Sequence, residues 1–284
     1  MAGQDDSAQS RATADEVRRE DVDGVVTVTF TRDRSRNAVT PGMFEVLYGA
    51  VRDLGDRDDL RVLVITGEGR FFTSGLDFAS LRLSVGEGTD GIVRGSNMRR
   101  QYRAEAHHDL FDEIESIEKP VVLAAQGHCF GVGVELGVSC DFRLVAEGAT
   151  FGLPEVANIA VIPGSGGISR LTRLVGPHWA RWLAMACETV DAEQALAIGL
   201  AHAVYPADTF AGQVQAFARK LAGLPREAMG LAKAAIDVAA SVDRRTAREF
   251  DRMAQTMLFM SDDFKDRVNA FMEASASRHR GGPA

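Results

Sequence analysis

The sequence predicts an α/β body followed by a helical C-terminal region. Up to about residue 205, short runs of apolar and β-branched residues alternate with segments of helical apolar spacing. From about residue 207 to residue 275, no run is convincing as a strand. Successive strand–helix crossovers favour a mostly parallel sheet. We therefore expect a body over residues 22–205 and a helical region over residues 206–284.

The first half of the body contains two strands around one helix. Residues 24–30 (GVVTVTF) form a short β-branched run, and residues 62–66 (VLVIT) form a continuous apolar run that ends at a glycine. Between them, Thr40 and Pro41 have the residue types of a helix N-cap and first helical position. The segments predict a strand, a helix starting at Thr40, and a strand buried on both faces.

The second half of the body begins with a Gly- and Ser-containing stretch over residues 80–96, which we expect to be mobile. We then expect a long amphipathic helix over residues 97–117. A strand over residues 121–125, a helix over residues 132–139 and a strand over residues 141–145 should follow.

Composition excludes several classes of protein. A net charge of −8 argues against a general nucleic-acid binder. Three cysteines without CxxC spacing favour free thiols in a reducing cytoplasm over disulfides or a metal site. We expect no membrane span, because no run approaches the ~18–20 apolar residues required. Residues 1–21 are polar, without the apolar core of a secretory signal, and predict a disordered lead-in.

Two glycine-rich loops stand next to acidic residues. Residues 72–77 (FTSGLD) follow a strand, and Gly75 permits backbone conformations that would let the Leu76 amide face a cleft. Residues 127–136 (GHCFGVGVEL) form a strand-to-helix turn, where unpaired N–H groups favour a developing oxyanion. Glu135 lies in the first turn of that helix, and Glu155 follows in a loop. Two carboxylates beside one water could divide general-base and general-acid work.

In their order and spacing these segments resemble the crotonase family, the enoyl-CoA hydratases and isomerases, from about residue 24 to residue 271. The resemblance implies a spiral of repeated β-β-α turns with C-terminal trimerisation helices. It also implies an acyl-CoA thioester substrate, a homotrimer or dimer of trimers, and no metal or other cofactor. It makes the Leu76 and Val132 amides the oxyanion donors, with Gly75 and Gly131 beside them, and makes Glu135 and Glu155 the pair that acts as catalytic base and acid.

Contacts with coenzyme A follow from the same resemblance. Residues 34–38 (RSRNA) match the loop that runs beside the pantetheine and adenine. Arginines there could meet phosphates through charge-assisted hydrogen bonds. The remaining positions that we expect to contact substrate or to shape its site are Arg34, Arg36, Ala38, Asp77 and Phe271. We expect Asp77 to shape its loop rather than to take part in the chemistry.

The sequence departs from the family pattern at two places beside the site. Residues 131–133 read Gly-Val-Gly where many relatives have three glycines. After Glu155, one extra residue precedes Pro163, and Ile159 stands where glycine is usual. The first change bears on acyl-chain preference more than on the chemistry, whereas the second could move Glu155 or reshape the acyl pocket.

Hydration of a 2-enoyl-CoA is the leading hypothesis, and four alternatives stay open. The FTSGLD loop is similar to that of dienoyl-CoA isomerases, although those relatives have aspartate at position 135 and again at position 163. A 3-enoyl-CoA isomerase or a hydrolase also fits the family. A different class, a non-catalytic acyl-CoA- or RNA-binding protein, is disfavoured because the helix over residues 97–117 mixes both charge signs.

Overall fold

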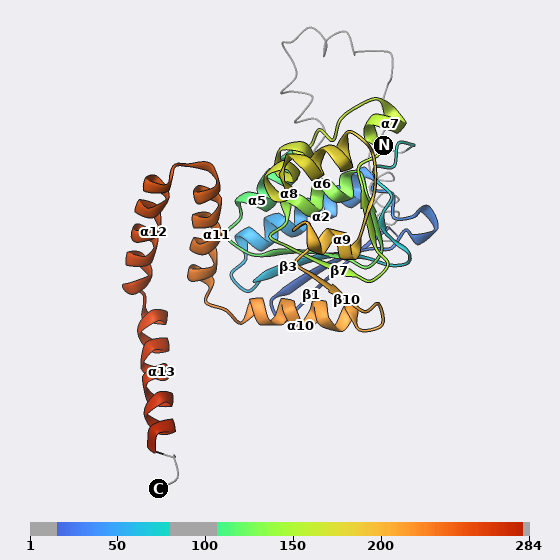
Figure 1. The fold of residues 1–284 in the computed structure, drawn as a ribbon. Helices are drawn as coiled ribbons and strands as arrows, with labels where there is room; N and C mark the ends of the chain where they lie inside the picture. The colour runs from blue at the N-terminus through green and yellow to red at the C-terminus, as the bar shows by residue number, and fades with distance from the viewer. Residues whose placement is uncertain (1–15, 80–106, 281–284) are drawn as a thin grey trace, which may run out of the picture. The chain divides into compact units, whose positions relative to one another are not determined.

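The structure, a computed structural model, describes residues 16–79 and 107–280 of the 284-residue chain. The chain divides into two compact units, residues 1–222 and 223–284, and each is described by itself. The first unit contains two β-sheets with helices against them (Figure 1). The expected mobile segment over residues 80–96 and the expected helical residues 97–106 lie outside the described residues.

The larger sheet has six strands in the order β1-β2-β3-β5-β7-β10. All neighbouring pairs are parallel except β1 and β2, which confirms the expected mostly parallel sheet. Its central strands are buried on both faces, as their continuous apolar runs predicted. The strands are β1 (Val17–Val22), β2 (Val25–Phe30), β3 (Val62–Gly67), β5 (Val121–Ala125), β7 (Phe142–Ala146) and β10 (Ala203–Tyr205).

The smaller sheet is built from short strands, three of which directly follow strands of the larger sheet along the chain. Its strands, in order, are β4 (Phe71–Thr73), β6 (His128–Phe130), β8 (Thr150–Gly152) and β9 (Val190–Asp191). Strand β3 leads into β4, β5 into β6 and β7 into β8, and each pair is followed along the chain by a helix. These successive β-β-α turns form the predicted spiral. Because β4 and β6 are parallel, the loops that follow them leave the sheet at the same edge.

The helices of the first unit follow the expected sequence signals. Thr40 caps α2 (Pro41–Asp56), with its Oγ1 accepting a hydrogen bond from Met43 N at 3.3 Å. Helix α6 (Val132–Ser139) has the predicted bounds. The other helices are the 3₁₀ turn η1 (Asp33–Ser35), α5 (His107–Ser116), α7 (Glu155–Ile159), α8 (Gly167–Ala184), α9 (Ala192–Ala197) and α10 (Phe210–Ala222).

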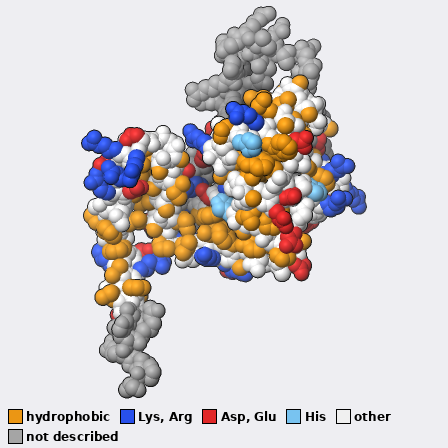
Figure 2. Space-filling model, viewed as in Figure 1, with side chains coloured by type: hydrophobic (Ala, Val, Ile, Leu, Met, Phe, Trp, Pro, Cys, Tyr) orange, Lys and Arg blue, Asp and Glu red, His pale blue; other side chains and the backbone are white. Residues whose placement is uncertain are grey.

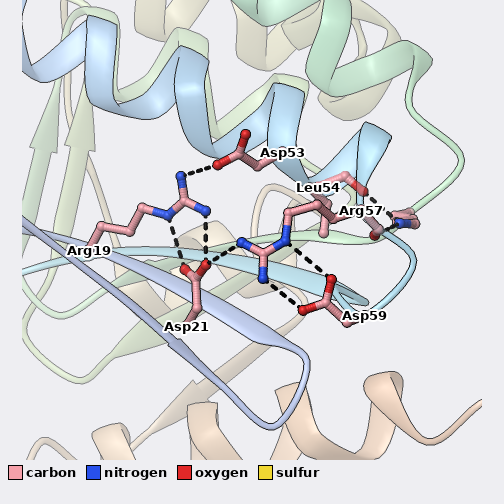
Figure 3. Close-up of polar contacts among 7 residues, drawn as sticks. Arg19, Asp21, Asp53, Leu54, Arg57 and Asp59 are labelled. Carbon is pink, nitrogen blue, oxygen red and sulfur yellow. Dashed lines mark hydrogen bonds and ion pairs between the residues drawn. The ribbon is translucent and has the colours of Figure 1, made fainter.

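The prediction of a disordered lead-in through residue 21 is wrong for its last residues. Val17–Val22 form β1, which pairs antiparallel with β2. Arg19 bridges Asp21 at 2.9 Å and Asp53 of α2 at 2.7 Å (Figure 3). The charged residues of this segment therefore belong to an edge strand fixed by ion pairs, which composition alone does not distinguish from disorder. Residues 1–15 lie outside the described residues.

The second unit is helical, as predicted, with α11 (Arg226–Ser241), α12 (Arg244–Phe259) and α13 (Asp262–Arg280). Sequence analysis placed the boundary at residue 205, whereas the first compact unit extends through α10 to residue 222. Large apolar side chains gather on the surface of α12 and α13 (Figure 2). Among the described residues, no helix is both long and apolar enough to cross a bilayer.

Candidate active site

The loops that follow β4 and β6 lie against each other. Gly75 has a φ of +110° and Gly131 a φ of +58°, conformations that side chains rarely adopt. A Cβ built on Gly131 would lie 3.5 Å from Gly75 Cα. The structure thus brings together the two glycine loops that the sequence singled out.

An amide in each loop is left outside the backbone pairing. Val39 N donates to Gly75 O, and Asp77 N donates to Val39 O, both at 2.9 Å. These two hydrogen bonds use the residues before and after Leu76 and leave the Leu76 N–H unused. Val132 is the first residue of α6, where N–H groups have no intrahelical acceptor. Within the described residues, neither amide has a hydrogen-bond acceptor.

Glu135 is buried, with 5% of its surface exposed, at the junction of α6 and α8. Ser165 N donates to its Oε1 at 2.8 Å, and the Gly167 amide is a second donor. Burial, reinforced by the charge of Glu155, raises the pKa of Glu135 to about 7, against the opposing effects of these amides and Arg170. A carboxyl held this way can exchange a proton near neutral pH.

Glu155 lies against the Gly131 turn. Its Oε1 is 3.1 Å from the position that a Cβ on Gly131 would occupy. Its Oε2 is buried and has no hydrogen-bond partner within the described residues. Burial raises the pKa of Glu155 as well. The sequence placed Glu155 in a loop, whereas it begins the five-residue helix α7, directly after Pro154.

The expected coenzyme A residues fall into three groups. Arg34 and Arg36 are exposed around η1, and the Arg36 guanidinium lies 5.6 Å from the centre of the Phe71 ring. Ala38 uses its carbonyl to accept a hydrogen bond from Arg32 Nη1 at 2.6 Å. Phe271 is exposed on α13, in the second unit, so it is not placed relative to this site.

Asp77 is built into its loop. Its Oδ2 accepts a hydrogen bond from Arg32 Nη1 at 2.9 Å, and its Oδ1 accepts one from Ala79 N at 3.1 Å. These contacts support a role in shaping the loop over direct contact with a ligand.

Sequence reasoning missed the support of Glu135 by the start of α8. The donors are main-chain groups of Ser165 and Gly167, which have no side-chain signature. The Gly166-Gly167 pair before an amphipathic run was the available signal: a Cβ on Gly167 would lie 2.7 Å from Glu135 Oε1. Gly167 is therefore needed for close approach.

Comparisons with known proteins agree with this geometry. A family model described as enoyl-CoA hydratase/isomerase matches residues 20–281. The chain belongs to the enoyl-CoA hydratase/isomerase family. A crotonyl-CoA hydratase from Syntrophomonas wolfei is 32% identical over 244 residues, covering 85% of this chain and 89% of that protein.

Other members of the family give the same result. A short-chain-enoyl-CoA hydratase from Clostridium acetobutylicum is 30% identical, covering 88% of this chain and 91% of that protein. A crystal structure of an enoyl-CoA hydratase from Bacillus anthracis superposes with a TM-score of 0.81 at 28% identity, covering 91% of this chain and 96% of that one. The crotonase fold predicted from the sequence is confirmed.

Replacing Gly167 by alanine should displace the side chain of Glu135. Alanine is a better helix former than glycine, but its Cβ would collide with Glu135 Oε1 and Cγ, each 2.7 Å away. We expect kcat for the family reaction to fall by ~10-fold or more, because small displacements of a reacting group are costly.

Gly212→Ala is the matched control for that change. A Cβ on Gly212 in α10 meets nothing within 4 Å, so this variant should keep its activity and gain about 0.5–1 kcal/mol of stability. Steady-state kinetics and thermal unfolding of both variants test the prediction. Equal activity in the two variants would contradict it.

Proposed function

We propose that this protein hydrates the 2,3 double bond of a short-chain 2-enoyl-CoA thioester. The observation that carries the proposal is the pair of carboxyl groups beside the glycine loops, the buried Glu135 and the half-buried Glu155. Both have raised pKa values, and Glu155 Oε2 has no partner within the described residues. Two such groups can hold one proton between them near neutral pH.

The reaction then needs one charged and one neutral carboxyl group. The ionised carboxylate takes a proton from water as its oxygen bonds to C3, and the electron pair of the double bond moves toward the thioester oxygen. The amides of Leu76 and Val132 donate to this oxygen and stabilise the enolate. The protonated carboxyl gives its proton to C2, which restores the thioester and transfers the shared proton to the other glutamate. Written this way, hydration needs no metal or redox cofactor.

Coenzyme A would bind along the loop around η1. Arg34 and Arg36 are exposed cations suited to phosphates. Arg36 also lies over Phe71, the first residue of β4, which ends at the loop containing Leu76. The exposed apolar side chains of α12 and α13 support assembly into a trimer or a dimer of trimers.

Crotonyl-CoA is the substrate that tests the proposal. The names of two relatives, crotonyl-CoA hydratase and short-chain-enoyl-CoA hydratase, support a short acyl chain. We expect purified protein to remove the absorbance of the conjugated enoyl thioester and to form 3-hydroxybutyryl-CoA, identified by mass. Folded protein that binds coenzyme A but leaves crotonyl-CoA unchanged would overturn hydration and lead to tests of 3-enoyl- and dienoyl-CoA isomerisation.

A further inference from the structure

Arg170, in the first turn of α8, lies in a set of contacts that none of the steps above uses. Its side chain is only 10% exposed. Its Nη2 contacts Asp112 Oδ1 at 2.5 Å, and its Nε donates to Glu115 Oε2 at 2.9 Å, both on α5. Its Nη1 donates to Ser165 O at 3.0 Å. The guanidinium therefore holds the residue whose own amide binds Glu135.

The backbone between Arg170 and Glu135 leaves no room for side chains. A Cβ on Gly166, which has a φ of +79°, would lie 2.0 Å from Arg170 Nη1. A Cβ on Gly167 would lie 2.7 Å from Glu135 Oε1. Gly166 and Gly167 therefore let the backbone pass closely between the Arg170 guanidinium and the Glu135 carboxyl group.

We propose that Arg170 is a positioning residue, which fixes the Ser165 backbone so that its N–H holds Glu135 in the reactive orientation. The proposal rests on the function proposed above. Asp112 contacts Nη2 and Glu115 contacts Nε, so these two carboxylates favour the orientation in which Nη1 donates to Ser165 O. Hydrogen bonds that orient a reacting group through a second residue commonly matter for rate more than for substrate binding.

The pKa of Glu135 provides a readout that would not change if Arg170 only supported the fold. The groups that act on Glu135 are Glu155 of α7, which raises its pKa, and Arg170 of α8, which lowers it together with the amides of Ser165 and Gly167. On α5, the charged groups facing Arg170 are Asp112 and Glu115, with His108 nearby. Removing the cation should therefore raise the pKa of Glu135.

Arg170→Gln tests the proposal, with Arg173→Gln as the matched control on the exposed side of α8. We expect kcat for crotonyl-CoA to fall by about 10-fold with KM within twofold of the wild type. The ¹³Cδ resonance of Glu135, assigned by its loss in Glu135→Gln, should titrate at a higher pH in Arg170→Gln. Arg173→Gln should change neither quantity.

Two further variants keep the test decisive if Arg170→Gln does not fold. Arg170→Lys keeps the charge but cannot contact Ser165, Asp112 and Glu115 together, and Asp112→Asn/Glu115→Gln releases the guanidinium. Both should lower kcat at least threefold at unchanged KM. A kcat and Glu135 titration equal to those of Arg173→Gln would overturn the proposal, as would a lower kcat of Arg170→Gln without a titration shift. A titration shift in a protein without hydratase activity would support positioning while removing the proposed function.

Discussion

Replacing either Glu135 or Glu155 by glutamine should lower kcat for crotonyl-CoA hydration by about 10²-fold or more. Glutamine has nearly the same shape, so Ser165 N can still donate to the amide oxygen at position 135. What is lost is proton exchange, because an amide neither takes a proton from water nor gives one to C2. Initial rates from the enoyl absorbance, with KM determined separately, measure the effect.

Glu147→Gln is the control for this pair, since Glu147 is exposed in the turn before β8. It should keep the wild-type rate. Near wild-type kcat in both active-site variants would remove the glutamates from the chemistry.

The Glu155→Gln variant also tests the electrostatic coupling of the two glutamates, because deleting the Glu155 charge should lower the pKa of Glu135 from about 7. The ¹³C titration of Glu135 in Glu155→Gln should move toward lower pH, opposite to its movement in Arg170→Gln.

Arg143→Met should lower the free energy of unfolding by about 3–5 kcal/mol, the largest stability effect that we expect. Arg143 is buried, and its guanidinium satisfies three carbonyls: Leu200 O at 2.7 Å, Cys140 O at 2.6 Å and Gly137 O at 3.2 Å. Gly137 and Cys140 end the helix that contains Glu135. Methionine fills much of the volume but leaves Leu200 O and Cys140 O buried without this donor, while Gly137 O keeps only its hydrogen bond from Cys140 N at 3.2 Å.

Urea denaturation followed by circular dichroism measures that change. Arg219→Met, at an exposed position on α10, is the control and should stay within about 0.5 kcal/mol of the wild type. A similar small change in Arg143→Met would mean that other groups or water satisfy the three carbonyls after the substitution.

The sequence predicted most of the fold because the signals were local. Continuous apolar runs located β3 and β5, and Thr40-Pro41 located the start of α2. It failed at β1, where a charged segment is stabilised by pairing with β2 and by the ion pair to Asp53, both distant contacts. It also failed at β9, because a two-residue strand has no periodicity to detect.

Within the site, the sequence predicted the two glycine loops and the two glutamates that the structure brings together, and the roles of these residues in the reaction stay a prediction. It could not identify the Ser165 amide or the Arg170 contact. A backbone donor is independent of the side chain at its position. An arginine in the first turn of an amphipathic helix has the same pattern whether it faces solvent or, as Arg170 does, a buried carbonyl.

Glu135 and Glu155 belong to helices that are buried to very different extents. Glu135 belongs to α6, whose residues are almost all buried, whereas α7 has no buried residue and ends at Ala160 in a left-handed conformation. Lengthening or rewriting the chain after Glu155 therefore removes no core contact, and the extra residue before Pro163 is such a change. Changes within α7 can therefore alter the surroundings of Glu155 without disturbing the core, whereas most substitutions in α6 would disturb the packing that holds Glu135.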